Sequence, residues 1–259
     1  MKTQFNLSEL PLSQFEALGI YRDRQLLLEP EEISTLLSGR RTTLISLHEL
    51  KGADFSIERL DARLSLHRQP TGAVELLIHP IYRNARAHPL LNNQEMQELI
   101  SGSKSFIGKA VEREEGVAAM YNIEYDQSTR DFVGYYVSKV QAPERVNGML
   151  LSEEEKSAFQ RGELLELSDG TKLQHRATEP KGMLSDRKAL VLSVLLDGGI
   201  SYLLLRGINS LSGTQEQRDH KTPAFNAALL EMEGSKVLKQ REFISPELQV
   251  QPQGRGMGR

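Results

Sequence analysis

The sequence predicts an α+β fold of three related helix-strand-hairpin units with antiparallel sheets, followed by a disordered C-terminal tail. A twelve-residue motif that ends in glycine occurs three times along the chain. After each copy the apolar residues change from helical spacing to the alternation of a strand. The composition of the 259 residues, 39% hydrophobic and 26% charged, is typical of a globular protein.

The repeated motif has the features of a short helix with both ends marked. Asn92 with Glu95, and Ser152 with Glu155, fit a side-chain N-cap followed by an acid at the third helical position. In the first copy Pro30 suits the first helical position, where its missing N–H is not needed. The final glycine suits the left-handed residue that ends a helix. The three copies are residues 28–39, 91–102 and 151–162.

Each motif is followed by a strand and then a hairpin. The turns at residues 70–72, 126–130 and 197–199 separate the hairpin strands, and Asp197-Gly198 is a strong hairpin signal because both central residues take positive φ. The third hairpin is apolar at nearly every position, so we expect both of its faces to be buried, in the core or at an interface. The expected strands are residues 42–47, 60–67 and 74–78, then 106–111, 118–125 and 132–140, then 164–167, 190–196 and 200–205.

Two segments lie outside the units. Residues 11–20 read as another short helix ended by glycine. Residues 223–244 fit either a helix with one apolar face or a hairpin that turns at Gly234, and we favour the hairpin. The expected domains are residues 1–88 (N-terminal helix and first unit), 89–150 (second unit), 151–206 (third unit), 207–248 (C-terminal extension) and 249–259 (disordered tail).

Charge and cysteine content exclude several classes of function. Lys and Arg number 32 against 35 Asp and Glu, which gives a net charge of −3 and disfavours a protein that coats nucleic acid. The chain has no cysteine, so disulfides, thiolate zinc sites, iron–sulfur clusters and cysteine nucleophiles are excluded. No stretch approaches the ~20 apolar residues of a membrane span, and no signal-peptide pattern is present, so we expect a cytoplasmic protein without membrane contact.

Motifs for catalysis and cofactor binding are incomplete. Residues 102–110 resemble a phosphate-binding loop, but five residues separate the glycines instead of four, and Ala110 replaces the hydroxyl that binds magnesium. His67 and His79 flank one hairpin and could approach each other as metal ligands, although a surface strand pair explains them better. No Gly-x-Ser-x-Gly elbow occurs. We therefore predict no catalytic, cofactor-binding or metal-binding residue and no cofactor.

Aromatic and basic residues form the candidate contact surface. Tyrosines gather in the second hairpin next to basic residues, an arrangement that can stack the bases of single strands. The alternative is that they are core residues, because Tyr121 and Tyr125 share a strand face with Ile123. The candidate contacts to a partner or to nucleic acid are Arg40, Arg41, Tyr121, Tyr125, Arg130, Tyr135, Tyr136, Lys139, Arg255 and Arg259.

Three segments resemble a known group of domains. Residues 125–132 and 142–148 and the helix motif at 151–162 resemble the paired domains of unknown function in Bacteroides-type conjugative elements and large polyvalent mobile-element proteins. Residues 11–20 and 36–42 look like the first domain of that pair. The resemblance covers most of residues 5–206 and implies a setting of DNA transfer and its protection. It implies no activity and no catalytic residue.

These observations favour a non-catalytic binding or adaptor protein of mobile-element machinery, with a protein as its partner. Repeated units offer related surfaces to such a partner. The alternative is a nucleic-acid-binding accessory protein in conjugative DNA processing or protection. A hydrolase with an acidic site is a third hypothesis, and it requires a cleft that gathers carboxylates or histidines from different units.

Overall fold

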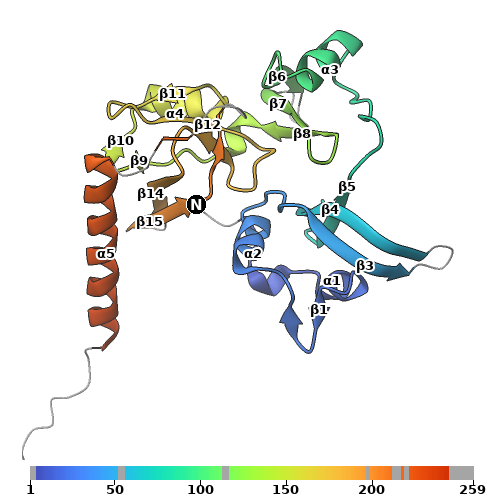
Figure 1. The fold of residues 1–259 in the computed structure, drawn as a ribbon, viewed down its shortest axis with the longest axis horizontal. Helices are drawn as coiled ribbons and strands as arrows, with labels where there is room; N and C mark the ends of the chain where they lie inside the picture. Colours follow the sequence, from blue (N-terminus) through green and yellow to red (C-terminus); the bar gives the residue numbers. More distant parts are fainter. Residues whose placement is uncertain are drawn as a thin grey trace, which may run out of the picture.

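The computed structural model has the predicted α+β class (Figure 1). The structure describes residues 4–51, 56–112, 117–196, 199–211, 217–218 and 222–244. The predicted tail at 249–259, with Arg255 and Arg259, lies outside the described residues, as do Asp197 and Gly198 of the third turn. Among the described residues, no helix is both long and apolar enough to cross a membrane.

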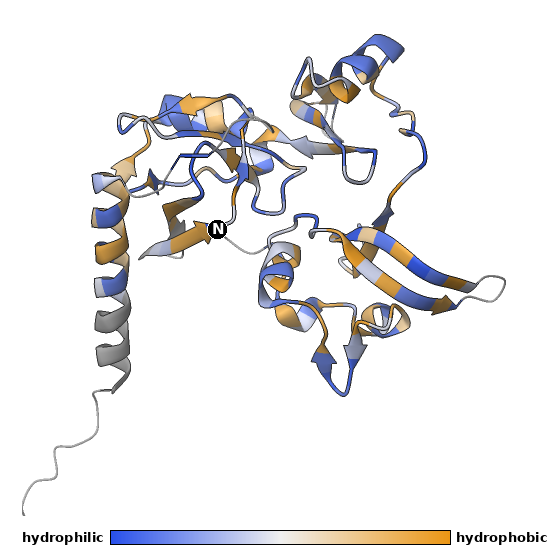
Figure 2. Cartoon of the chain, viewed as in Figure 1, coloured by the Kyte–Doolittle hydropathy of each residue, from blue (hydrophilic) through white to orange (hydrophobic). Residues whose placement is uncertain are grey.

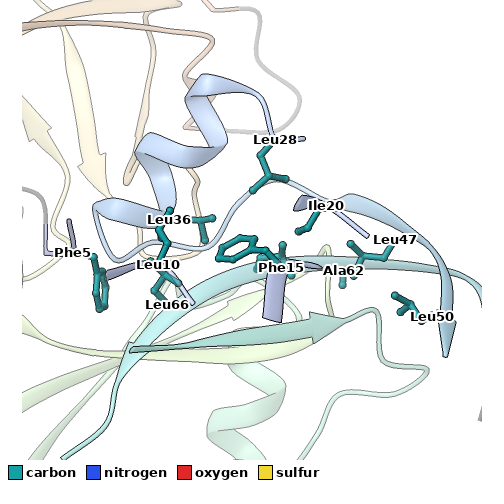
Figure 3. Close-up of a cluster of buried hydrophobic side chains, with 11 residues drawn as sticks. Phe5, Leu10, Phe15, Ile20, Leu28, Leu36, Leu47, Leu50, Ala62 and Leu66 are labelled. Atoms are coloured by element: carbon teal, nitrogen blue, oxygen red, sulfur yellow. The ribbon is translucent and has the colours of Figure 1, made fainter. Parts of the chain in front are cut away.

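The N-terminal segment packs on the first unit. It contains η1 (Leu7–Glu9), α1 (Leu12–Ala17), β1 (Tyr21–Arg22) and β2 (Gln25–Leu26), and α1 is the predicted short helix before Gly19. The first unit continues with α2 (Pro30–Leu37) and the antiparallel sheet β3 (Ile45–Lys51), β4 (Ser56–Arg68) and β5 (Val74–Pro80). Figure 3 shows Phe15 of α1 among Leu36, Ile20 and Ala62, in the core that joins the helices to this sheet.

The second unit repeats this order. It consists of α3 (Asn93–Ile100), β6 (Ile107–Glu112), β7 (Ala118–Asp126) and β8 (Asp131–Tyr136), with β6-β7-β8 again an antiparallel sheet of adjacent strands. Its core is smaller and centres on Leu99, Ile123 and Phe132. The last strand is shorter than expected because the 3-10 helix η2 (Val137–Lys139) follows it directly.

The third unit keeps the helix and the expected strand at residues 164–167, but the other strands of its sheet differ from those expected. After α4 (Glu153–Gln160), the sheet consists of β11 (Leu165–Glu166), β12 (Lys172–His175) and β13 (Met183–Ser185), and β16 (Asn209–Ser210) adds to it in parallel. The strands β12 and β13 contain four and three residues and are too short to show an alternating pattern, so they were not expected. All three units are therefore a helix followed by an antiparallel meander.

The apolar hairpin assigned to the third unit belongs to a separate sheet. Its strands β14 (Ala189–Leu196) and β15 (Gly199–Arg206) pair with each other, and β14 also pairs with β9 (Arg145–Val146), whose other neighbour is β10 (Met149–Leu150). Residues 189–194 of β14 are buried on both faces, as predicted, whereas residues 201–204 of β15 are only half-buried. This strand is thus shared between the core of the third unit and a second apolar cluster.

The predicted helix ends are confirmed. The side chains of Asn92 and Ser152 accept hydrogen bonds from the amides of Glu95 and Glu155, at 2.9 and 3.1 Å, whereas Glu29 caps nothing and Pro30 begins α2. The glycines after the three helices, Gly39, Gly102 and Gly162, have φ of 72°, 74° and 78°. Local signals that act within four residues were therefore sufficient to place these helices.

The preference for a hairpin at residues 223–244 was wrong, because this segment is the helix α5 (Pro223–Ile244). Thr222 caps this helix: its hydroxyl oxygen accepts a hydrogen bond from the amide of Phe225 at 3.1 Å. Phe225 and Ala228 are buried against Ala189 and Val191 of β14, so one apolar helix face meets the doubly buried strand. Figure 2 shows both orange and blue residues along the described part of α5.

Candidate functional site

The first and second units are joined by buried ion pairs. Arg41, in the loop after α2, lies 3.1 Å from Asp131 and 3.8 Å from Asp126. Arg63 of β4 lies 3.4 Å from the same Asp126 carboxylate, and its side chain is 9% exposed. Charges this far from water persist only when opposite charges lie close to them. These contacts therefore require the two units to hold a fixed arrangement.

The third unit joins the same buried region through the segment after β12. The carbonyl of Thr178 accepts a hydrogen bond from Arg63, while its amide and hydroxyl both donate to Glu124 of β7 at 3.1 Å. Burial raises the pKa of Glu124 above the usual value for a glutamic acid. We call Arg41, Arg63, Glu124, Asp126, Asp131 and Thr178 the polar cluster. It contains residues from all three units, and it is their common contact.

A pocket lies beside the polar cluster. It has a volume of about 320 Å³ and is bordered by the loop after α2, by β4 and β5 of the first unit, by β8 and η2 of the second, and by β12 of the third. Its wall contains Arg40, Arg41 and Lys139. The described residues that line it include no Asp or Glu. Such a wall favours an anionic group.

Arg40 is held in the wall by the third unit. Its Nε donates to the carbonyl of Pro180 at 3.0 Å. The side chain passes over Gly182, where a Cβ atom would lie 3.2 Å from Cδ of Arg40, closer than such contacts normally come. Burial lowers the pKa of Arg40 to about 10, so the guanidinium remains charged at neutral pH. A charged donor is thus fixed in position before any ligand arrives.

Two histidines in the wall are neutral. Burial, with the nearby Arg41 and Arg63, lowers the pKa of His79 to about 4, and its Nε2 lies 2.8 Å from the hydroxyl of Ser65. Burial, with Arg40, lowers the pKa of His175 to about 3. The ring of His175 meets Tyr135 edge-on, at a centroid distance of 5.0 Å. At neutral pH these rings therefore provide hydrogen-bonding nitrogens without adding charge.

Five of the ten predicted contact residues line this pocket, and all of them were chosen from two short sequence segments. They are Arg40, Arg41, Tyr135, Tyr136 and Lys139. Three others lie elsewhere. Tyr121 packs against Tyr136 at a ring-centroid distance of 4.9 Å, Tyr125 packs against Phe132, and Arg130 donates to the carbonyl of Arg83 at 2.8 Å.

The sequence-based prediction missed His175 and the polar cluster except for Arg41. The available signal was a charged residue inside an apolar strand: Arg63 stands between Ala62 and Leu64, and Glu124 stands between Ile123 and Tyr125. His67 and His79, considered above as a metal pair, both line the pocket. Across the strand pair His67 is opposite Glu75, and His79 is opposite Arg63. Within the described part of the chain, no group of three His, Cys, Asp or Glu residues could hold a metal ion.

Comparison with known families adds a match at the N-terminal end of the chain. Residues 5–90 match the model of a family described as a protein of unknown function (DUF4099). This range spans the N-terminal segment and the whole first unit, including Arg40, Arg41 and Arg63. Neither the curated proteins nor the solved structures contain a significant match to the chain.

Proposed function

We propose that the protein is a non-catalytic binding or adaptor protein of mobile-element machinery, and that the pocket between its three units holds an anionic group of a partner protein. The supporting observation is the composition of the pocket wall, in which Arg40, Arg41 and Lys139 occur without a carboxylate among the described residues. Such a wall binds and orients an anion. The mobile-element setting and a cytoplasmic location come from the sequence and its resemblance, and they remain part of the proposal.

The tyrosines of the second hairpin are better explained as packing residues than as a base-stacking platform. Tyr121 and Tyr136 pack against each other, and Tyr135 packs against His175, so the rings contact protein on at least one side. All three have raised pKa values or half-buried side chains, which reflects their position inside the fold. We therefore favour a protein partner over single-stranded nucleic acid.

A nucleic-acid-binding accessory protein in conjugative DNA processing is the second candidate, because Tyr135, Tyr136 and three cations share one pocket. Binding to a single strand at increasing salt distinguishes the two functions. If nucleic acid is the partner, affinity falls steeply as the salt concentration rises, because phosphate contacts release counterions. If the proposed function is correct, the protein shows little single-strand binding at physiological salt.

The direct test is affinity purification of the full chain from its native host, with and without nuclease, followed by mass spectrometry. We expect a protein partner that resists nuclease and is captured by the wild type. Lys139→Gln removes a cation from the pocket wall and should lose this partner, whereas Lys104→Gln, which removes an exposed lysine outside the pocket, should retain it. Loss of the partner after nuclease, or equal capture by Lys139→Gln, would contradict the proposed function.

A further inference from the structure

We propose that the pocket between the three units recognises a phosphate monoester of a group that contains a ring system, called a ring phosphate below. The inference rests on the proposed function in one respect, that this pocket is the binding site. It adds the chemical class of the ligand. The shared chemistry occurs in two sources, a phosphorylated aromatic side chain of a partner protein and a free nucleotide.

The charge of the wall favours phosphate over a carboxylate. Arg40, Arg41 and Lys139 surround the pocket, and they come from two different units. A phosphate monoester carries about −1.5 to −2 charges at pH 7 and presents three acceptor oxygens, whereas a carboxylate carries one charge and two oxygens. Guanidinium groups also match phosphate geometry through paired N–H donors. Arg41 is already paired with Asp131, but Arg40 and Lys139 leave the wall positively charged, and the phosphate matches this charge better.

Two buried nitrogen atoms in the wall make no hydrogen bond within the described structure. They are Nη1 of Arg41, whose contact with Asp126 is 3.8 Å long, and Nδ1 of His175. A buried polar atom without a hydrogen bond is costly, and most such atoms in folded proteins have a protein or water partner. The two residues belong to different units, and both line the pocket. Both atoms are shielded from the open space of the pocket, so the case for phosphate rests on the charges of the wall and on its apolar lining.

The remaining wall indicates what carries the phosphate. Leu66, Leu77, Val133 and Val140 provide an apolar lining, next to the rings of Tyr135 and His175. The volume of about 320 Å³ is near the lower end of the roughly 300–1,000 Å³ range of small-molecule pockets. A phosphate group alone would leave this apolar lining uncovered. One ring system attached to the phosphate would cover it, while a dinucleotide cofactor needs more room.

Isothermal titration calorimetry on the full chain tests the ligand class with defined probes. The probes are adenosine 5′-monophosphate, a phosphotyrosine peptide, orthophosphate, adenosine, and the same peptide with glutamate in place of phosphotyrosine. We expect at least one ring phosphate to bind at least tenfold more tightly than orthophosphate, adenosine and the glutamate peptide, and the tighter of the two ring phosphates identifies the source. Absence of binding by both ring phosphates, or equal binding of the glutamate peptide, would overturn the inference.

Variants then locate the binding. Lys139→Gln should weaken the binding of the ring phosphate roughly tenfold, because it removes one charge-assisted contact. Lys139 is exposed, so we expect the variant to fold. Arg40→Gln should weaken the binding of the ring phosphate more, because Arg40 is half-buried and lies in a drier environment than the exposed Lys139. Lys104→Gln and Arg59→Gln, which remove exposed cations outside the pocket, are the matched controls. Equal losses in the controls would overturn the assignment to this pocket.

The outcomes separate the inference from the proposed function. If Lys139→Gln loses the nuclease-resistant partner but neither ring phosphate binds, the inference fails and the proposed function stands. If a ring phosphate binds in the pocket but partner capture is unaffected by Lys139→Gln, the proposed function fails and the ligand class stands.

Discussion

The interiors of the units and the contact between them are built from different chemistry. Each unit has an apolar core of its own, with Phe15 and Leu36 in the first, Ile123 in the second and Phe159 in the third, and these side chains are no more than 1% exposed. The units meet instead through the polar cluster of ion pairs and hydrogen bonds.

This difference places the pocket where directional interactions set the geometry. Apolar packing tolerates substitutions of similar volume. A buried ion pair does not, because removing one partner leaves the other charge buried without an opposite charge. The core of each unit therefore stabilises that unit, and the polar cluster, besides contributing stability, determines how Arg40, Lys139 and His175 face one another. The predictions below test whether these two roles can be separated.

The largest effect is expected in a core. Phe15→Ala should lower the free energy of unfolding by about 3–5 kcal/mol, because it removes a fully buried ring from between the helices and the first sheet. Chemical denaturation measures the change. Leu7→Ala, at a residue that is 62% exposed, is the control and should change stability by less than about 0.5 kcal/mol. Equal effects of the two substitutions would contradict the assignment of the core.

The next effect concerns the polar cluster. Asp126→Asn should lower the free energy of unfolding by about 3 kcal/mol, because it leaves Arg41 and Arg63 buried with less opposing charge. In a double-mutant cycle, Asp126→Asn with Arg63→Gln should cost less than the sum of the single substitutions. Asp61→Asn removes the carboxylate of an exposed pair with Arg59 and should leave stability nearly unchanged. Additive losses at Asp126 and Arg63 would show that the polar cluster is not a coupled unit.

The third prediction concerns pH. The folded pKa values of His79 and His175, about 4 and about 3, lie below the ordinary value of 6.5, so below pH 6.5 the unfolded chain binds protons that the folded chain does not. The contribution of the two neutral histidines to the free energy of unfolding is therefore complete above pH 6.5. It falls as the pH drops toward 4, by up to about 1.4 kcal/mol per pH unit for each histidine.

Urea denaturation at pH 7.0, 6.0 and 5.0 measures this slope. His175→Gln should flatten it, and His48→Gln, at an exposed position on β3, should not. A slope that is the same in the wild type and His175→Gln would mean that His175 is not held neutral by burial.

The smallest effect distinguishes capped from uncapped helices. Asn92→Ala and Ser152→Ala should each lower the free energy of unfolding by about 1 kcal/mol, because each removes the hydrogen-bond acceptor for an amide in the first helical turn. Glu29→Ala at the matching position of α2 should cost less, since Glu29 makes no cap hydrogen bond. Thermal denaturation followed by circular dichroism measures all three. If Glu29→Ala lowers stability as much as Asn92→Ala, the difference between capped and uncapped helices is contradicted.

The units could be predicted from the sequence to the extent that their signals are local. The capping residues and final glycines lie within one helical motif, and the hairpins of the first two units have strands long enough to alternate. In the third unit β11 lies within the expected strand at residues 164–167, but β12 and β13 could not be predicted, because they contain four and three residues. In α5, Gly234 suggested a turn, but burial of Phe225 and Ala228 against β14 outweighs the cost of one glycine, about 1 kcal/mol.

The pocket was only half predictable, for a different physical reason. Arg40, Arg41, Tyr135, Tyr136 and Lys139 were identified because they cluster in sequence. His175 stands alone in its segment, and Arg63 and Glu124 acquire their partners only when the three units come together. Their pairing is a property of the packing between units, and single-sequence patterns describe local periodicity.

The most direct test of this account is hydrogen exchange of the full chain with and without a saturating concentration of the tighter ring phosphate. The account predicts slower exchange in segments of all three units at once: Gln4 and residues 38–41, 65–67 and 77–79 of the first, 133–141 of the second and 175–177 of the third. Exchange that slows in one unit alone, slows outside these segments, or does not change at all would contradict a ligand pocket formed jointly by the three units.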